Sequence, residues 1–150
     1  MISPEPIFRI HAELADILHL GTTPYGDRRV INIVGGRVEG ERLSGRILPG
    51  GADWQIVRAD GVLELEARYT LELDDGTFVG VVNRGFRHGS PEVLARLAAG
   101  EAVPPEAYYF RTNPVFTVPA GPHAWLDRTI FVGTAERAAD AVVIRYFELL

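Results

Sequence analysis

Two aspartates stand close to tryptophans in this sequence, and each pair could do acid–base chemistry beside an aromatic ring. Asp53-Trp54 follows a double glycine. A carboxyl group can move protons and an indole ring can stack on a ligand, so this pair predicts a proton-transfer site at the mouth of a pocket. In the structural alternative, Asp53 caps the turn and Trp54 plugs the core. The sequence leaves both interpretations open.

Strand periodicity groups a second set of polar and aromatic side chains. Side chains alternate between the two faces of a strand, so residues two apart share a face. Mixed aromatic and polar faces are typical of a polar-lined ligand cavity, whereas a packed interior more often shows uninterrupted Val, Ile and Leu. If these faces meet solvent instead, the alternate residues Leu126, Ile130 and Phe110 make the core. The two faces consist of Trp125, Asp127 and Thr129, and of Tyr109, Arg111 and Asn113.

Single residues complete the candidate site. The guanidinium fork of Arg111 could hold a substrate carboxylate or phenolate, or pair with a barrel aspartate. Asn83 lies two residues before Gly85. Its side chain could orient a substrate carbonyl, or it could hydrogen-bond to the backbone of a β-bulge beside the glycine. Tyr69 shares a strand face with leucines, which favours a core position, and Arg68 lies on the opposite face. The predicted catalytic residues are Asp127, Asp53 and Arg111, and the predicted substrate-binding residues are Trp54, Trp125, Tyr109, Asn83, Tyr69 and Arg68.

Composition removes several classes of function. The chain has no cysteine, so disulfides and thiolate sites are excluded, and all fifteen basic residues are arginine, so a Schiff base or a P-loop lysine is excluded as well. The four histidines are scattered and show no ligand spacing, so we expect no metal and no cofactor. The net charge is −5 with the cations dispersed singly, which argues against nucleic acid.

The pattern of alternation predicts an all-β protein. Period-two hydrophobicity recurs along the chain between glycine-rich turns, and Asp74-Asp75-Gly76 is a hairpin signal. Eight or nine consecutive strands hide their edges completely only in a closed barrel, so we predict a single antiparallel β-barrel of about eight strands over residues 1–150. The expected strands are 6–20, 28–34, 37–48, 53–59, 64–73, 77–87, 107–118, 124–134 and 141–149, with breaks at 35–36, 49–51, 60–61 and 119–122.

One segment predicts a short helix that covers an end of the barrel. Ser90 suits an N-cap, Pro91 suits the first helical position, and Gly100 ends the segment. The N-terminus lacks the features of a secretory signal and no apolar run is long enough to span a bilayer, so a cytoplasmic location is expected. Small barrels often pair through exposed strand faces, so a homodimer is also expected, although no segment marks the interface.

Several segments resemble one known family. They lie in matching order from about residue 7 to the C-terminus and are similar to the domain-of-unknown-function 3237 family, also called the uncharacterised protein family 0311. The resemblance implies an antiparallel β-barrel of about eight strands and implies little about activity. In that family the position of Asp127 is usually asparagine, so the carboxylate here either adds an acid–base group or is simply tolerated. The segments are Gly35-Gly36-Arg37-Val38-Glu39-Gly40, Pro49-Gly50-Gly51-Ala52-Asp53-Trp54, Asn83-Arg84-Gly85, Tyr108-Tyr109-Phe110-Arg111-Thr112 and Trp125-Leu126-Asp127.

The sequence therefore favours a small-molecule-binding barrel that acts as a cofactor-free acid–base enzyme. These candidate residues would suit an isomerase, a cyclase, or a lyase or hydratase that acts on an apolar or aromatic metabolite. Asp127 and Asp53 would move protons, and Arg111 would hold an oxygen. Two alternatives stay open: a non-catalytic carrier of a hydrophobic ligand, and a fully packed structural or interaction barrel.

Overall fold

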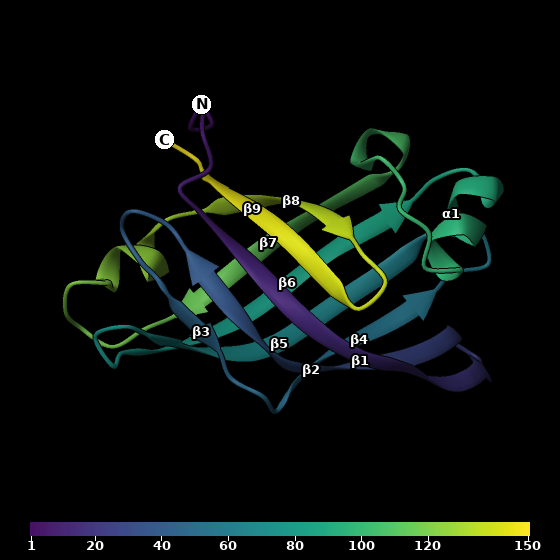
Figure 1. Cartoon of the computed structure of the whole chain (residues 1–150), viewed down its shortest axis with the longest axis horizontal. Coiled ribbons are helices and arrows are strands. Elements are labelled where there is room, and N and C mark those ends of the chain that lie inside the picture. The colour runs from purple at the N-terminus through teal and green to yellow at the C-terminus, as the bar shows by residue number, and fades with distance from the viewer.

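The chain folds into nine β-strands with one short α-helix. The computed structural model describes residues Met1 to Leu150 (Figure 1). All neighbouring strands are antiparallel. The strands are β1 (Phe8–Thr23), β2 (Gly26–Glu39), β3 (Gly45–Ile47), β4 (Gly51–Val57), β5 (Leu63–Leu73), β6 (Phe78–His88), β7 (Tyr109–Thr117), β8 (Phe131–Arg137) and β9 (Ala141–Glu148).

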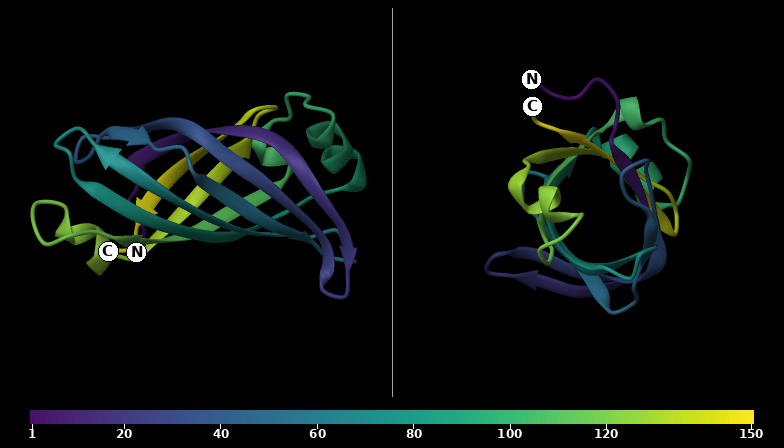
Figure 2. Two further views of the ribbon diagram at one scale, coloured as in Figure 1. Left: turned by 90° about the horizontal axis from the view of Figure 1, so that it is seen from below. Right: turned by 90° about the vertical axis from the view of Figure 1, so that its left-hand side faces the viewer.

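The sheet closes on itself into a barrel with eight positions. β1 pairs with both β2 and β9, which joins the two ends of the strand order. β3 and β4 occupy one position together, because both lie between β2 and β5 at successive levels. Figure 2 shows the resulting ring end-on. The predicted antiparallel barrel of about eight strands is confirmed.

Both ends of the barrel are covered. The helix α1 (Pro91–Ala98) and the 3-10 turn η1 (Pro105–Ala107) lie at one end, and the 3-10 turn η2 (Ala124–Arg128) lies at the other (Figure 1). The predicted helix is confirmed: the Ser90 hydroxyl accepts a hydrogen bond from the Val93 N–H at 3.2 Å, and Pro91 opens the helix. Leu97 of α1 packs into the barrel core, so the helix closes this end.

Two predicted features of the strands are wrong. The expected break at 35–36 lies inside β2, where the ladder with β1 shifts register. Gly36 has a φ of 142°, and a Cβ there would collide with the backbone oxygen of His11, so the glycine permits close strand approach instead of ending the strand. The expected strand 37–48 divides into the end of β2, a loop over 40–44, and β3.

The segment predicted as a strand over 124–134 begins as the 3-10 turn η2. The Thr129 hydroxyl donates to the Trp125 backbone oxygen at 2.8 Å, which closes the turn. Leu126 inserts into the core as an end plug, and the strand begins only at Phe131. Trp125, Asp127 and Thr129 therefore share no strand face, because a 3-10 turn lacks the period of two.

The inward faces of the strands make one continuous core. On β5, for example, Leu63, Leu65, Ala67, Tyr69 and Leu71 are buried while their alternate neighbours face outward. The predicted hairpin joins β5 to β6, and Gly76 supplies the positive φ of 89° that its turn requires. No helix has the length and the apolarity needed to cross a bilayer.

Candidate functional site

The register of the strands points a group of polar side chains toward the interior of the barrel, both at its middle and near one end. On β4, Asp53 stands opposite Ile31 and Ala67, which are both buried. Gln55 follows on the same face, opposite Arg29 and Leu65. Since neighbouring strands point paired residues to the same side, Asp53 and Gln55 face the interior. β4 thus places a carboxyl group and an amide inside an otherwise apolar wall.

A chain of two hydrogen bonds fixes the carboxyl group of Asp53. The Gln55 Nε2 donates to Asp53 Oδ2 at 2.7 Å, and the Gln55 Oε1 accepts from Arg29 Nε at 2.7 Å. A guanidinium group can only donate, so Arg29 orients the amide with its NH₂ group toward Asp53. The second carboxyl oxygen, Oδ1, is shielded from solvent and has no partner. One oxygen is held, and the other is free for a ligand.

Burial changes the acidity of this carboxyl group. It raises the pKa of Asp53 to about 6, and the Gln55 hydrogen bond, the charges of Arg29 and Arg87 and, least of all, the Glu66 backbone N–H offset that rise only in part. The Glu66 N–H forms no hydrogen bond of ordinary geometry with Oδ1. A carboxyl group with such a pKa can both give and take a proton near neutral pH, which is the property of a general acid–base group.

A second polar group lies deeper in the barrel and consists of an amide and two phenols. The Asn83 Nδ2 donates to the Tyr146 hydroxyl at 3.0 Å, and the Tyr146 and Tyr69 hydroxyls lie 3.5 Å apart. Burial raises the pKa of both phenols above the ordinary value, so both stay neutral and can act as hydrogen-bond donors. Asn83 is 1% exposed, yet its Oδ1 has no partner.

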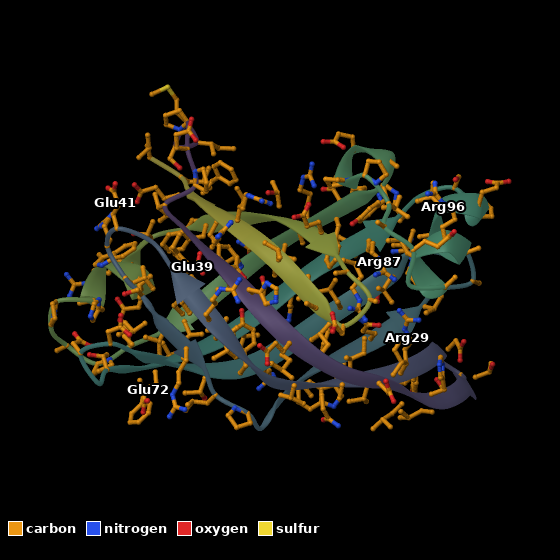
Figure 3. All side chains as sticks on the ribbon, viewed as in Figure 1. Arg29, Glu39, Glu41, Glu72, Arg87 and Arg96 are labelled. Atoms are coloured by element: carbon orange, nitrogen blue, oxygen red, sulfur yellow. The ribbon has the colours of Figure 1, made fainter.

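Three arginines gather toward the end of the barrel that α1 covers. Arg29, Arg87 and Arg137 come from β2, β6 and β8, each on an inward face that continues with buried apolar residues. Figure 3 shows Arg29 and Arg87 toward the α1 end. Burial and the positive charges of Arg29 and Arg137 lower the pKa of Arg87 to about 10. The pKa of Arg29 and that of Arg137 are also lowered, mainly by burial.

Asp53, Gln55, Tyr69, Asn83, Arg87 and Arg137 line one cavity of about 40 Å³, and Arg29 and Tyr146 lie behind its wall, hydrogen-bonded to Gln55 and Asn83. Three buried polar atoms without a partner belong to residues of its wall: Asp53 Oδ1, Asn83 Oδ1 and Arg87 Nε. Buried polar atoms are normally hydrogen-bonded, so three unsatisfied atoms around one space indicate a site that a ligand or water completes. The rest of the wall is mostly aliphatic, and includes Ile31, Ile33, Leu65, Ala67, Val142 and Ile144.

A much larger hollow lies on the outer surface of the barrel. This outer groove has a volume of about 1020 Å³ and runs across the outward faces of β4 to β8. Trp54, Phe86 and Tyr109 line it and are 40 to 47% exposed. Its acid Glu66 forms an exposed ion pair with Arg84, with 2.5 Å between Oε1 and an Arg84 nitrogen.

The structure separates the residues that the sequence grouped together. Asp53, Asn83 and Tyr69 line the inner cavity, as an interior site requires. Trp54, Tyr109 and Arg111 face outward and line the outer groove. The solvent-facing alternative therefore holds for the face of Tyr109 and Arg111, and Trp54 neither lines the inner cavity nor plugs the core. On β7 the alternate residues Phe110 and Thr112 are the ones that point inward.

Asp127 and Arg68 also lie outside the interior, and Trp125 lies at its edge, partly buried against the core but not at the inner cavity. Asp127 is in η2, its side chain is 41% exposed, and its nearest charged partner is Arg128 at 3.7 Å. Trp125 packs against Phe131, with the Arg42 guanidinium 3.7 Å above the indole ring. Arg68 is exposed and lies 3.6 Å from Glu66. Trp125 and Asp127 do not point inward together because they lie in the 3-10 turn η2 and not in a β-strand.

Sequence reasoning missed Gln55, Arg29, Arg87 and Arg137. A signal was present in the alternation: Arg87 shares a strand face of β6 with Val79, Val81 and Asn83, which are buried, and with Gly85 between Asn83 and Arg87. A charged residue in phase with an apolar face points to the end of a barrel interior. No group of three or more His, Asp or Glu side chains is placed to hold a metal ion.

Comparison with known proteins places the chain in a family. The model of a family described as "Protein of unknown function (DUF3237)" matches residues 2–149. The chain belongs to the DUF3237 family. A UPF0311 protein of Rhodopseudomonas palustris is 46% identical over 144 residues, which cover 96% of this chain and 94% of the relative. A UPF0311 protein of Clostridium acetobutylicum is 41% identical over 83% of this chain and 78% of its own length.

Solved structures share the barrel. The crystal structure of a conserved protein of unknown function from R. palustris has a TM-score of 0.93 at 44% identity, and covers all of this chain and 98% of its own. A β-barrel-like protein from Acinetobacter baumannii has a TM-score of 0.86 at 41% identity, with 100% and 97% covered. An enzyme from Penicillium herquei has a TM-score of 0.73 at 16% identity, with 100% and 94% covered, which is a likeness of fold alone.

Proposed function

We propose that this DUF3237 protein is an acid–base enzyme that moves a proton within a small organic molecule bound in the inner cavity. Asp53 is the proton-transfer group. The observation that carries the proposal is the geometry of this carboxyl group: Gln55 holds one oxygen, and the other is buried and unpaired at the cavity wall. Buried carboxyl oxygens are normally hydrogen-bonded, so an unpaired one at a cavity wall indicates a position that a ligand or water occupies.

The proposed step keeps atoms and electrons in balance. The Asp53 carboxylate takes a proton from an acidic C–H or O–H bond of the substrate, and the electron pair of that bond moves into the adjacent unsaturated system. The Asp53 carboxylic acid then returns the proton to another atom of the same molecule. The substrate is neither oxidised nor reduced, and an isomerisation or a ring closure by internal addition fits this scheme.

The amide and phenol group supplies the polar contacts for such a step. Tyr69 stays neutral and lines the cavity, so its hydroxyl can donate a hydrogen bond to a substrate oxygen that gains negative charge. The unpaired Asn83 Oδ1 can accept a hydrogen bond from a substrate hydroxyl. The aliphatic wall selects a molecule with an apolar body.

The cavity is small, and this sets a condition on binding. Its volume of about 40 Å³ is close to the ~30 Å³ that a water molecule occupies in the liquid. Arg87 and Arg137 are half-buried residues of the cavity wall, so their side chains reach from the cavity toward solvent. A substrate therefore binds with rotation of these long side chains, which have many rotamers available.

One alternative function is the binding of a hydrophobic ligand without turnover. The inner cavity would serve that function through its aliphatic wall, but a carrier needs no unpaired carboxyl oxygen there. The fold neighbour from Penicillium herquei is described as an enzyme, which supports catalysis in a barrel of this shape without transferring any residue role.

Untargeted mass spectrometry of a cell extract tests the proposal. The extract is incubated with the wild-type protein or with Asp53→Asn, in H₂O and in D₂O. We expect a compound that only the wild type converts, into a product of unchanged mass and different retention time in H₂O. A gain of one mass unit in D₂O would show that the Asp53 proton exchanges with solvent between the two transfers, and no gain would show direct return of the same proton. A product that both proteins form equally would remove Asp53 from the reaction. An extract that neither protein changes would favour the carrier.

A further inference from the structure

The three interior arginines carry more positive charge than the protein balances. Asp53 is the only carboxyl group of the inner cavity wall. Arg29, Arg87 and Arg137 belong to no ion pair of the protein. Against the larger effect of burial, the negative charge of Asp27 raises the pKa of Arg29, and that of Asp140 raises the pKa of Arg137. Both aspartates are exposed to solvent, however, and form no ion pair with these arginines. With Asp53 ionised, three guanidinium groups share one interior carboxylate.

The surface arginines behave differently. Ten of them form an ion pair with an Asp or Glu side chain. The protein therefore has enough acidic residues to pair with arginine. The solvent-facing arginines that pair in this way are Arg9, Arg37, Arg42, Arg46, Arg58, Arg68, Arg84, Arg96, Arg128 and Arg145. Of the arginines outside the barrel, only Arg28 and Arg111 form no ion pair, and both line the solvated outer groove. None of the three inward-facing arginines has an acidic partner within 4 Å, although burial makes an unpaired charge more costly there.

Hydrogen-bonding capacity is also left over. Arg29 donates through Nε to Gln55, and Arg137 donates through one terminal nitrogen to the backbone oxygens of Ala138 and Ala141. The Nε of Arg87 is buried and has no partner. Each guanidinium group has five N–H donors in a fixed fork, so the three together retain several donors that can bind an oxyanion.

We propose that the molecule bound in the barrel is an organic carboxylate, whose carboxyl group lies between Arg29, Arg87 and Arg137 and whose apolar body reaches inward. The carboxylate supplies the missing negative charge and the planar partner that a guanidinium fork binds through two parallel hydrogen bonds. One part of this inference rests on the proposed function: if Asp53 transfers the proton, the reacting atom of the bound carboxylate lies beside Asp53 Oδ1.

The position of the groups gives this substrate a direction. Arg29 and Arg87 lie toward the α1 end (Figure 3), while Tyr69 and Asn83 are at most 7% exposed and lie deeper. An anionic head at the arginines directs the rest of the molecule along Ile31, Leu65 and Ile144. The binding energy of the head is thereby available to position the body for proton transfer.

Binding of a matched acid and amide tests the inference without any turnover. The probes are 3-phenylpropionate and 3-phenylpropanamide, which differ in charge but hardly in shape. Calorimetry should show at least about tenfold tighter binding of the acid to the wild type, because charge-assisted bidentate contacts replace neutral ones. Arg87→Gln should reduce this preference to less than about threefold. Arg84→Gln, on the outward face of the same strand, should keep it.

The outcomes separate this inference from the proposed function. Asp53→Asn should keep or strengthen the preference for the acid while it abolishes turnover. Equal binding of acid and amide to the wild type, or an unchanged preference in Arg87→Gln, would overturn the carboxylate assignment and leave the role of Asp53 untouched. Binding of neither probe, together with no rise in Tm in acetate or inorganic phosphate, would also overturn it. Stabilisation by phosphate but not by acetate would contradict a carboxylate and indicate a phosphorylated ligand.

Discussion

The outer groove is the larger of the two hollows, but the inner cavity holds the more unusual chemical groups. The outer groove holds about 1020 Å³ and carries exposed aromatic rings, whereas the inner cavity holds about 40 Å³. Yet Glu66 of the groove is exposed and paired with Arg84, while Asp53 of the cavity is unpaired on one oxygen and has a raised pKa. Volume favours the outer surface, and chemistry favours the interior.

The comparison shows what makes a carboxyl group reactive. A surface ion pair is solvated and screened, so it contributes little energy. Inside the barrel the same residue types lose water, and the remaining contacts decide their protonation. A small space with unsatisfied buried groups is therefore a better candidate for catalysis than a large solvated groove.

The largest expected effect is the loss of turnover in Asp53→Asn. The amide keeps the shape of the side chain but cannot take a proton, so kcat/KM should fall about 10²- to 10⁴-fold. The measurement is conversion of the compound identified from the extract. Asp127→Asn is the matched control, and it should change kcat/KM less than twofold because Asp127 is exposed in η2. A large loss in Asp127→Asn would move the reaction out of the barrel.

The pH dependence of stability tests the burial of Asp53. Its pKa is about 6 in the folded protein and about 3.8 in the unfolded chain, so the folded state holds the proton more tightly. The stabilisation is fully present below about pH 4 and is lost as pH rises through 6. Between pH 4 and pH 7 the wild type should lose about 2–3 kcal/mol relative to Asp53→Asn. Urea unfolding of both proteins at the two pH values measures this, and parallel pH profiles would show that Asp53 is not buried.

Removal of one interior arginine should not weaken the ligand-free protein. Arg87→Gln relieves repulsion from Arg29 and Arg137 and the cost of burying charge, so the free energy of unfolding should stay equal or rise by about 1 kcal/mol. Arg84→Gln loses one exposed ion pair and should cost less than about 1 kcal/mol. Chemical denaturation compares them. A loss of more than about 1 kcal/mol in Arg87→Gln would indicate a structural role.

The smallest effect is expected in the outer groove. Trp54→Ala removes an indole ring that is 40% exposed on the outward face of β4, next to Asp53 in sequence but on the other side of the sheet. We expect a change of less than twofold in kcat/KM for the same compound. A loss above tenfold would show that the groove, and not the inner cavity, binds the substrate.

Much of the fold follows from local patterns that the sequence carries openly. Alternation predicted most strands, Asp74-Asp75-Gly76 predicted the β5–β6 hairpin, and Ser90-Pro91 predicted the start of α1. These predictions succeed because each depends on a few neighbouring residues. The predicted strand over 124–134 failed because the need to plug the barrel with Leu126 outweighed local alternation.

The candidate site was only partly predictable. Asp53, Asn83 and Tyr69 were named from the sequence and do line the cavity, but Trp54, Arg111 and Asp127 were placed with them and lie elsewhere. The strand period alone separates Asp53 from Trp54, since adjacent residues on a strand point to opposite faces. Which of the two faces is the interior depends on partner strands far away in the chain.

The sequence by itself determined that this chain is a barrel with a carboxyl group after Gly50-Gly51, because periodicity and turn chemistry are local. Only the tertiary structure decided that Arg29, Gln55, Asp53, Arg87 and Arg137 meet, since they come from β2, β4, β6 and β8 and converge only when the sheet closes. It also decided the acidity of Asp53, because a pKa depends on how much water the surrounding strands remove.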